Sequence, residues 1–178
     1  MNRKQFIKRS AIGAGALVVQ PIMASKKELG REMASDPKIV RKDEGKIHSV
    51  LGDFQNMKLV GSDTNGQFTL IEQNNEPGFG IPPHVHENED EVFHVLSGQL
   101  EMTIGDEKTL MNQGDIIFCP RGIPHSFTVI GEEKAHVILS VFPSGIEKMF
   151  EELAALPAGP PDFEKVSRIC EKYQIEFV

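Results

Sequence analysis

The sequence predicts an all-β fold, either a jelly-roll barrel or a β-sandwich, followed by two short α-helices. Between residues 47 and 143, Gly, Pro and Asn recur every several residues, as they do at turns between short strands. After Pro143 the apolar residues change to a spacing of three and four, which is typical of amphipathic helices. The chain of 178 residues is long enough for one domain with a sizeable core. We therefore expect a barrel at residues 46–143 and a helical appendage at residues 144–178.

The barrel segment contains eight expected strands. Residues 67–73 and 101–104 alternate between apolar and polar side chains, as half-buried strands do. Turn signals at residues 63–66 and 105–106, and at Gly122 and Gly131, separate such segments. The expected strands are residues 56–62, 67–73, 81–86, 91–97, 99–104, 115–118, 125–130 and 135–142.

Two helices are expected after the barrel. Ser144 and Glu147 have the spacing of a capping box for the first, residues 157–161 interrupt it, and Asp162 can cap the second. Their apolar stripes either pack on the barrel wall or a second subunit, or form a lid over the barrel mouth. The stripes are Ile146, Met149, Phe150, Leu153 and Leu156, then Phe163, Val166, Ile169, Cys170 and Tyr173.

Residues 1–24 have the layout of a secretory signal, with a basic start, an apolar run at residues 11–19 and a small residue at Ala24. The apolar run is too short to span a bilayer, and no Cys follows it, so we expect no stable membrane anchor. The start also resembles a twin-arginine signal, although Lys4 stands where the second Arg would be. We therefore predict export to the periplasm through a twin-arginine or a Sec signal.

The charge distribution argues against nucleic acid as a partner. The overall net charge of −7 includes four cations within residues 1–24. Without them the chain carries 15 Lys and Arg against 26 Asp and Glu, a net charge of −11. A body this acidic repels polyanions, so we expect a small-molecule substrate instead.

Three histidines and a glutamate form the strongest chemical signal. His84 and His86 are two residues apart, so on a strand they share a face about 7 Å apart. Glu91 follows a few residues later, and His125 ends a second Gly- and Pro-containing segment. Three neutral nitrogens and a carboxylate suit a divalent transition metal, and Fe, Mn, Ni, Cu and Zn all remain candidates.

Two segments resemble the two sequence motifs of the cupin superfamily. The first is Gly78, five residues, His84-x-His86, four residues, Glu91, six residues and Gly98. The second is Gly114, five residues, Pro120-x-Gly122, two residues and His125. Its usual Asn is replaced by Val129, which leaves the four potential ligands intact. The short spacer between the motifs is similar to that of small single-domain bacterial cupins, including quercetin dioxygenase-like proteins.

The resemblance implies a cupin jelly-roll barrel in which His84, His86, Glu91 and His125 hold one metal ion. It also implies an exported dioxygenase-like oxidoreductase acting on a small hydroxyl- or keto-bearing substrate, aromatic substrates included, with Glu91 as a catalytic base. A non-redox isomerase or decarboxylase, and a non-catalytic ligand-binding cupin, remain alternatives. Small cupins often form homodimers, and residues 25–45 could serve as an exchanging arm. Strand parity suggests a substrate pocket formed by Phe79, Ile81, Phe93, Val95 and Phe127, and His136 is a further candidate whose direction depends on the strand register.

Other polar residues near the motifs have competing interpretations. His94 is three positions after Glu91, so strand alternation places it on the opposite face. Arg121 could meet an anionic substrate or face water, and Cys119 is a buried thiol or a conceivable thiolate ligand. Glu89 could replace Glu91 as a ligand.

Overall fold

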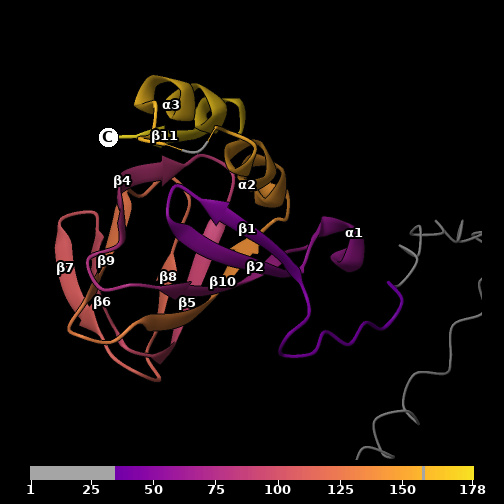
Figure 1. The fold of residues 1–178 in the computed structure, drawn as a ribbon, viewed down its shortest axis with the longest axis horizontal. Helices are drawn as coiled ribbons and strands as arrows, with labels where there is room; N and C mark the ends of the chain where they lie inside the picture. The colour runs from indigo at the N-terminus through magenta and orange to yellow at the C-terminus, as the bar shows by residue number, and fades with distance from the viewer. Residues whose placement is uncertain (1–34, 158) are drawn as a thin grey trace, which may run out of the picture. The chain divides into compact units, whose positions relative to one another are not determined.

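Two antiparallel β-sheets make up most of the fold in the computed structural model, which describes residues 35–157 and 159–178 (Figure 1). The expected export signal and residues 25–34 of the expected arm lie outside the described residues. Within the described part of the arm, Lys58 Nζ donates to the carbonyl of Lys42 at 2.6 Å, and Lys38 Nζ lies 2.7 Å from Asp63 Oδ2. This part of the arm therefore packs against its own barrel.

The first sheet has the strand order β1-β2-β3-β10-β5-β8, and the second has the order β11-β4-β9-β6-β7. The first contains β1 (Lys46–Val50), β2 (Asp53–Leu59), β3 (Thr69–Asn75), β10 (Ala135–Phe142), β5 (Asp90–Ser97) and β8 (Ile116–Cys119). The second contains β11 (Ile175–Phe177), β4 (Gly80–His86), β9 (His125–Ile130), β6 (Gln99–Ile104) and β7 (Glu107–Met111). Every pairing is antiparallel, which confirms the expected all-β barrel.

The alternation of side chains along the strands builds the core. In β10, for example, Val137, Leu139 and Val141 are buried, whereas the residues between them are partly exposed. Inward-facing residues of the other strands, including Ile71, Phe93 and Met102, are almost completely buried. Burial of this apolar surface provides the main driving force for closing the two sheets on each other.

All eight expected strands are present, but β2 and β3 are shifted by two or three residues, β4, β5 and β8 differ by one residue at one or both ends, and three strands were missed. β2 begins at Asp53 instead of residue 56, and β3 begins at Thr69 instead of residue 67. The missed strands are β1, β7 and β11. β1 and β7 are mostly exposed, so they lack an apolar alternation, and β11 has only three residues.

Three helices complete the described chain: α1 (Gly61–Thr64), α2 (Ile146–Ala154) and α3 (Phe163–Lys172). None of the helices in the described part is long and apolar enough to cross a lipid bilayer. Asp162 caps α3 as expected, because its side chain accepts a hydrogen bond from the Lys165 amide at 3.1 Å. Phe163 is 71% exposed, which corrects its assignment to the buried stripe; the buried face of α3 begins at Val166.

The expected capping box at the start of α2 was wrong. The N-cap is Gly145 rather than Ser144, and it has no side-chain cap. The Glu147 carboxylate instead accepts hydrogen bonds from the amides of Gly145 and Gly61, at 2.8 and 3.0 Å, and from Thr69 Oγ1 at 2.6 Å. Glu147 therefore ties α2 to the first sheet, which the local sequence could not reveal.

Replacing Glu147 with Ala is expected to destabilise the protein by about 2–4 kcal/mol, because one buried and two partly buried donors lose a charged acceptor. Burial raises the pKa of Glu147, but its hydrogen bonds outweigh that effect and the pKa is lowered overall. A carboxyl whose pKa is lowered by folding stabilises above its unfolded pKa, and the contribution is lost as pH falls through the folded pKa. Urea denaturation should therefore show a smaller difference between variant and wild type in acid.

A matched control is Glu151→Ala on the same helix, where the carboxylate meets only the exposed Lys46 at 2.6 Å. This change should cost less than about 1 kcal/mol. Equal destabilisation by the two variants would contradict the role assigned to Glu147.

Candidate metal centre

Four side chains from three strands converge inside the barrel. His84 and His86 lie on β4, and His125 begins β9, where it pairs directly with His84. Glu91 comes from β5 in the opposite sheet. All four are less than a tenth exposed, and one potential ligand atom from each lies within 4.8 Å of the others.

Hydrogen bonds at Nδ1 orient the rings of His84 and His125. Nδ1 of His84 lies 3.0 Å from the Pro82 carbonyl, and Nδ1 of His125 lies 3.2 Å from the Ile123 carbonyl. An Nδ1–H that donates to a carbonyl leaves Nε2 with a free lone pair, as a metal-binding histidine requires. The two carbonyls therefore set both rings in the tautomer that binds metal.

Carboxylates complete the arrangement around the third ring. Glu91 Oε2 lies 2.9 Å from Nε2 of His125, and its Oε1 lies 3.7 Å from Nε2 of His86. On the other side of the His86 ring, Nδ1 lies 3.5 Å from Oε2 of Glu89. Glu91 thus belongs to the cluster, whereas Glu89 is placed to orient His86 from outside it.

The pKa shifts of His84 and Glu91 favour metal binding. Burial lowers the pKa of His84 to about 4, so its imidazole is neutral at pH 7. Burial raises the pKa of Glu91, but the hydrogen bond with His125 and the electrostatic interactions with the surrounding imidazoles lower it overall, so the carboxylate is ionised. Burial also lowers the pKa of His86, yet Glu89 and Glu91 outweigh it and the net shift is upward. A buried carboxylate among imidazoles calls for a cation.

Two neighbouring residues do not join the cluster. Cys119 pairs with Glu91 across β5 and β8, and burial together with the Glu91 charge raises the pKa of its thiol to about 12. Arg121 forms a two-pronged ion pair with Asp90, with Nη2 2.8 Å from Oδ2 and Nε 3.0 Å from Oδ1. Cys119 is therefore a buried thiol, and Arg121 is engaged by Asp90 rather than offered to a substrate.

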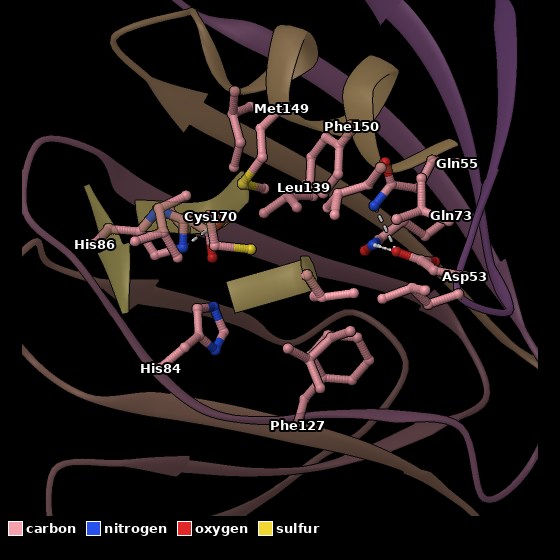
Figure 2. Close-up of a pocket in the computed structure, with 18 of the residues that line it drawn as sticks. Asp53, Gln55, Gln73, His84, His86, Phe127, Leu139, Met149, Phe150 and Cys170 are labelled. Carbon is pink, nitrogen blue, oxygen red and sulfur yellow. Dashed lines mark hydrogen bonds and ion pairs between the residues drawn. The ribbon is translucent and has the colours of Figure 1, made fainter. Parts of the chain in front are cut away.

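A cavity of about 90 Å³ opens beside the cluster (Figure 2). The barrel lines it with His84, His86, Glu91 and apolar side chains. The C-terminal segment supplies much of the remaining wall; its lining residues are Ile146, Met149, Phe150, Leu153, Val166, Cys170, Ile175 and Phe177. The helices thus cover the cavity as a lid, one of the two arrangements that the stripes allowed.

Half of the expected pocket residues lie elsewhere. Ile81, Phe93 and Phe127 line the cavity, but Phe79, Val95 and His136 are not among its lining residues. The Phe79 ring packs against Phe127 with centroids 6.2 Å apart, and Val95 is completely buried in the core. His136 is on the outer face of β10, where Nε2 lies 2.7 Å from Glu72 Oε1. Parity identified the inward face for Val95, but it could not give the depth of a residue along the barrel.

Sequence reasoning also missed a second polar group in the cavity: Asp53 and Gln55 on β2 and Gln73 on β3. β2 was expected to begin after Asp53 and Gln55, so neither was assigned an inward direction. The signal that could have found them is the alternation of Asp53, Gln55 and Met57, all three of which are buried.

Comparisons with known proteins agree with this geometry. A family model described as a cupin domain matches residues 72–142. Over 91 residues the chain is 31% identical to quercetin 2,3-dioxygenase of Bacillus subtilis (strain 168), covering 51% of this chain and 27% of that enzyme. The chain thus spans about a quarter of the length of that relative.

Solved structures share the fold. KdgF from a Halomonas species has a TM-score of 0.56 at 20% identity, covering 62% of this chain and 99% of that one. The polyketide cyclase RemF from Streptomyces resistomycificus has a TM-score of 0.52 at 27% identity, covering 60% and 79%. Together with the buried His and Glu cluster, the match of residues 72–142 to a cupin domain and the partial identity to quercetin 2,3-dioxygenase support assignment of this chain to the cupin superfamily of metal-binding proteins.

Proposed function

We propose that this protein is a mononuclear metal-dependent oxygenase acting on a small neutral substrate that bears hydroxyl or keto oxygens. His84, His86, Glu91 and His125 would hold one divalent transition metal. The observation that carries the proposal is the convergence of these four buried donors, three of which line a mostly apolar cavity. Four protein ligands leave positions for a substrate on a six-coordinate metal.

The chemistry that such a metal supplies is Lewis-acid activation of substrate oxygens and, for a redox-active ion, electron transfer to O₂. The side chains of the protein shape the cavity and can accept a proton from the substrate. Phe93, Phe127 and Leu139 exclude water and favour a flat, apolar substrate body. Glu91 can accept a proton from a substrate hydroxyl at its Oε1, which lies 3.7 Å from Nε2 of His86.

The cavity lining favours a neutral substrate. Among the described residues that line it, none is Lys or Arg, and Asp53 and Glu91 contribute carboxyl groups. A substrate carboxylate would find no Lys or Arg in this described lining, so the metal would be the only cation beside it to offset its charge. The partial identity to a dioxygenase supports the oxygenase reading, whereas the likeness to a polyketide cyclase keeps a non-redox reaction as the second candidate.

The cavity volume limits the size of the substrate. A cavity of about 150 Å³ binds benzene, and this one is about 90 Å³. A single-ring substrate therefore fits after small shifts of flexible side chains such as Met149, whereas a multi-ring substrate requires α2 and α3 to move.

The test is metal content by mass spectrometry, followed by O₂ uptake with single-ring diphenols and β-diketones. We expect near-stoichiometric metal in protein purified without chelator, and O₂ consumption by the Fe, Mn, Ni or Cu form but not by the Zn form. Product formed without O₂ uptake would instead support the isomerase or decarboxylase alternative. Protein that takes up no metal on reconstitution would overturn the proposal.

We further propose that the protein is exported and that it forms a homodimer. The basic and apolar pattern of residues 1–24 supports the first statement, and the resemblance to small cupins supports the second. Cell fractionation and analytical ultracentrifugation of the full chain test them.

A further inference from the structure

A second polar cluster lies in the cavity, away from the histidines. Asp53 and Gln55 begin β2, and Gln73 lies opposite Gln55 on β3. Their side chains are 2%, 2% and 3% exposed. Gln55 Nε2 donates to Asp53 Oδ2 at 2.5 Å, and Gln73 Nε2 donates to the same oxygen at 3.0 Å. Figure 2 shows the three side chains at one end of the cavity and His84 and His86 at the other.

Two acceptors of this cluster have no hydrogen-bond partner among the described residues. They are Asp53 Oδ1 and Gln55 Oε1, and both side chains line the cavity. A buried acceptor without a donor costs about 1–3 kcal/mol. Among the described residues, the Asp53 carboxylate accepts hydrogen bonds from the side-chain amides of Gln55 and Gln73, and not from a backbone amide that would stabilise a turn. A cluster serving only the fold would be expected to satisfy its own acceptors.

We propose that Asp53, Gln55 and Gln73 form a substrate-binding subsite that accepts a hydrogen bond from a neutral hydroxyl group. This inference rests on the proposed function, because the other end of the same substrate would bind at the metal centre. Between the ends, Phe127, Leu139 and Phe150 provide an apolar middle (Figure 2). The subsite selects substrates with an oxygen pair at one end and a hydroxyl at the other.

The same chemistry disfavours an anionic end group. A substrate carboxylate would bring acceptors to Asp53 Oδ1 and Gln55 Oε1, and the described lining contains no Lys or Arg to offset its charge. Burial raises the pKa of Asp53 despite the hydrogen bonds from Gln55 and Gln73. A hydroxyl can both donate and accept, so it satisfies Asp53 in either protonation state.

The test measures binding of three matched catechols to the zinc-loaded full chain by calorimetry, since zinc prevents oxidation of the ligand. The probes are 4-methylcatechol, 3,4-dihydroxybenzyl alcohol and 3,4-dihydroxybenzoate. We expect the alcohol to bind about tenfold more tightly than the methyl compound, the equivalent of one hydrogen bond. The benzoate should bind more weakly than either.

A Gln55→Met variant keeps the side-chain volume and removes both the free acceptor Oε1 and the amide that donates to Asp53. It should lose the preference for the alcohol and keep the affinity for 4-methylcatechol. Gln67→Met, at an exposed position outside the cavity, is the matched control and should behave as wild type. Binding of the three catechols to the wild-type protein tests the proposal by itself, so the test remains valid even if Gln55→Met does not fold.

The outcomes separate the two proposals. If 4-methylcatechol binds but the alcohol binds no better, the subsite is overturned and the metal-centre proposal stands. If no catechol binds to zinc-loaded protein, the proposed function fails, and the subsite inference fails with it.

Discussion

Replacing His86 with Ala is expected to lower metal affinity more than about 100-fold, because loss of even an outer hydrogen-bond partner of a ligand costs about 10–100-fold. His86 supplies one of four donors and is held between Glu91 and Glu89, at 3.7 and 3.5 Å. Its removal leaves three donors and takes one positive partner from the buried Glu91 carboxylate. Metal content by mass spectrometry and competition with a chelator measure the effect.

His94→Ala is the matched control. His94 lies on β5 three residues after Glu91 and is partly exposed, so its loss should leave metal content unchanged. Glu89→Gln should fall between the two, with a loss of about 10–100-fold, because Glu89 only orients the His86 ring. Retention of metal by His86→Ala at wild-type affinity would contradict the ligand assignment.

Deleting residues 174–178 is expected to lower both the melting temperature and the metal affinity. These residues include β11, which pairs with β4 so that Phe177 lies opposite His84 and Ile175 opposite His86. Loss of the buried Ile175 alone removes about 2–5 kcal/mol, which corresponds to a fall in Tm of roughly 5–15 °C. Without β11 the edge of β4 is exposed, so the strand that carries two histidines loses part of its support.

Differential scanning calorimetry with and without metal measures this effect. Deletion of Val178 alone is the control, because its side chain is exposed and only its amide reaches the barrel, at 3.0 Å from the Pro83 carbonyl. We expect that smaller deletion to change Tm by a few degrees at most. If the variant that lacks residues 174–178 keeps wild-type Tm and metal affinity, β4 does not need β11 as a partner at this edge of the sheet.

The sequence predicted the features that depend on residues lying close together in the chain. His84 and His86 share a face because a strand repeats every two residues, and Asp162 caps α3 because its side chain reaches an amide three residues ahead. Strand parity likewise placed His94 away from the cluster. These relations need only local backbone geometry, and the structure has them as expected.

The missed features depend on contacts between distant segments. Glu147 fits the pattern of a capping box, yet its carboxylate instead accepts from Gly61 and Thr69, about 80 residues earlier in the chain. Val95 was assigned to the pocket by parity, but its depth along the barrel depends on the register between strands, and that register also decides that His136 lies on the outer face of β10. No local pattern encodes that register.

The sequence by itself therefore determined the superfamily, the barrel and the four residues expected to bind metal, because motif spacing and periodicity are properties of neighbouring residues. The tertiary structure alone decided that α2, α3 and β11 cover the cavity, and that Asp53, Gln55 and Gln73 lie in it with His84 and His86. The reason is that burial of the C-terminal apolar faces and pairing of β11 with β4 depend on contacts between residues that are far apart in the chain. These contacts form only when the whole barrel closes.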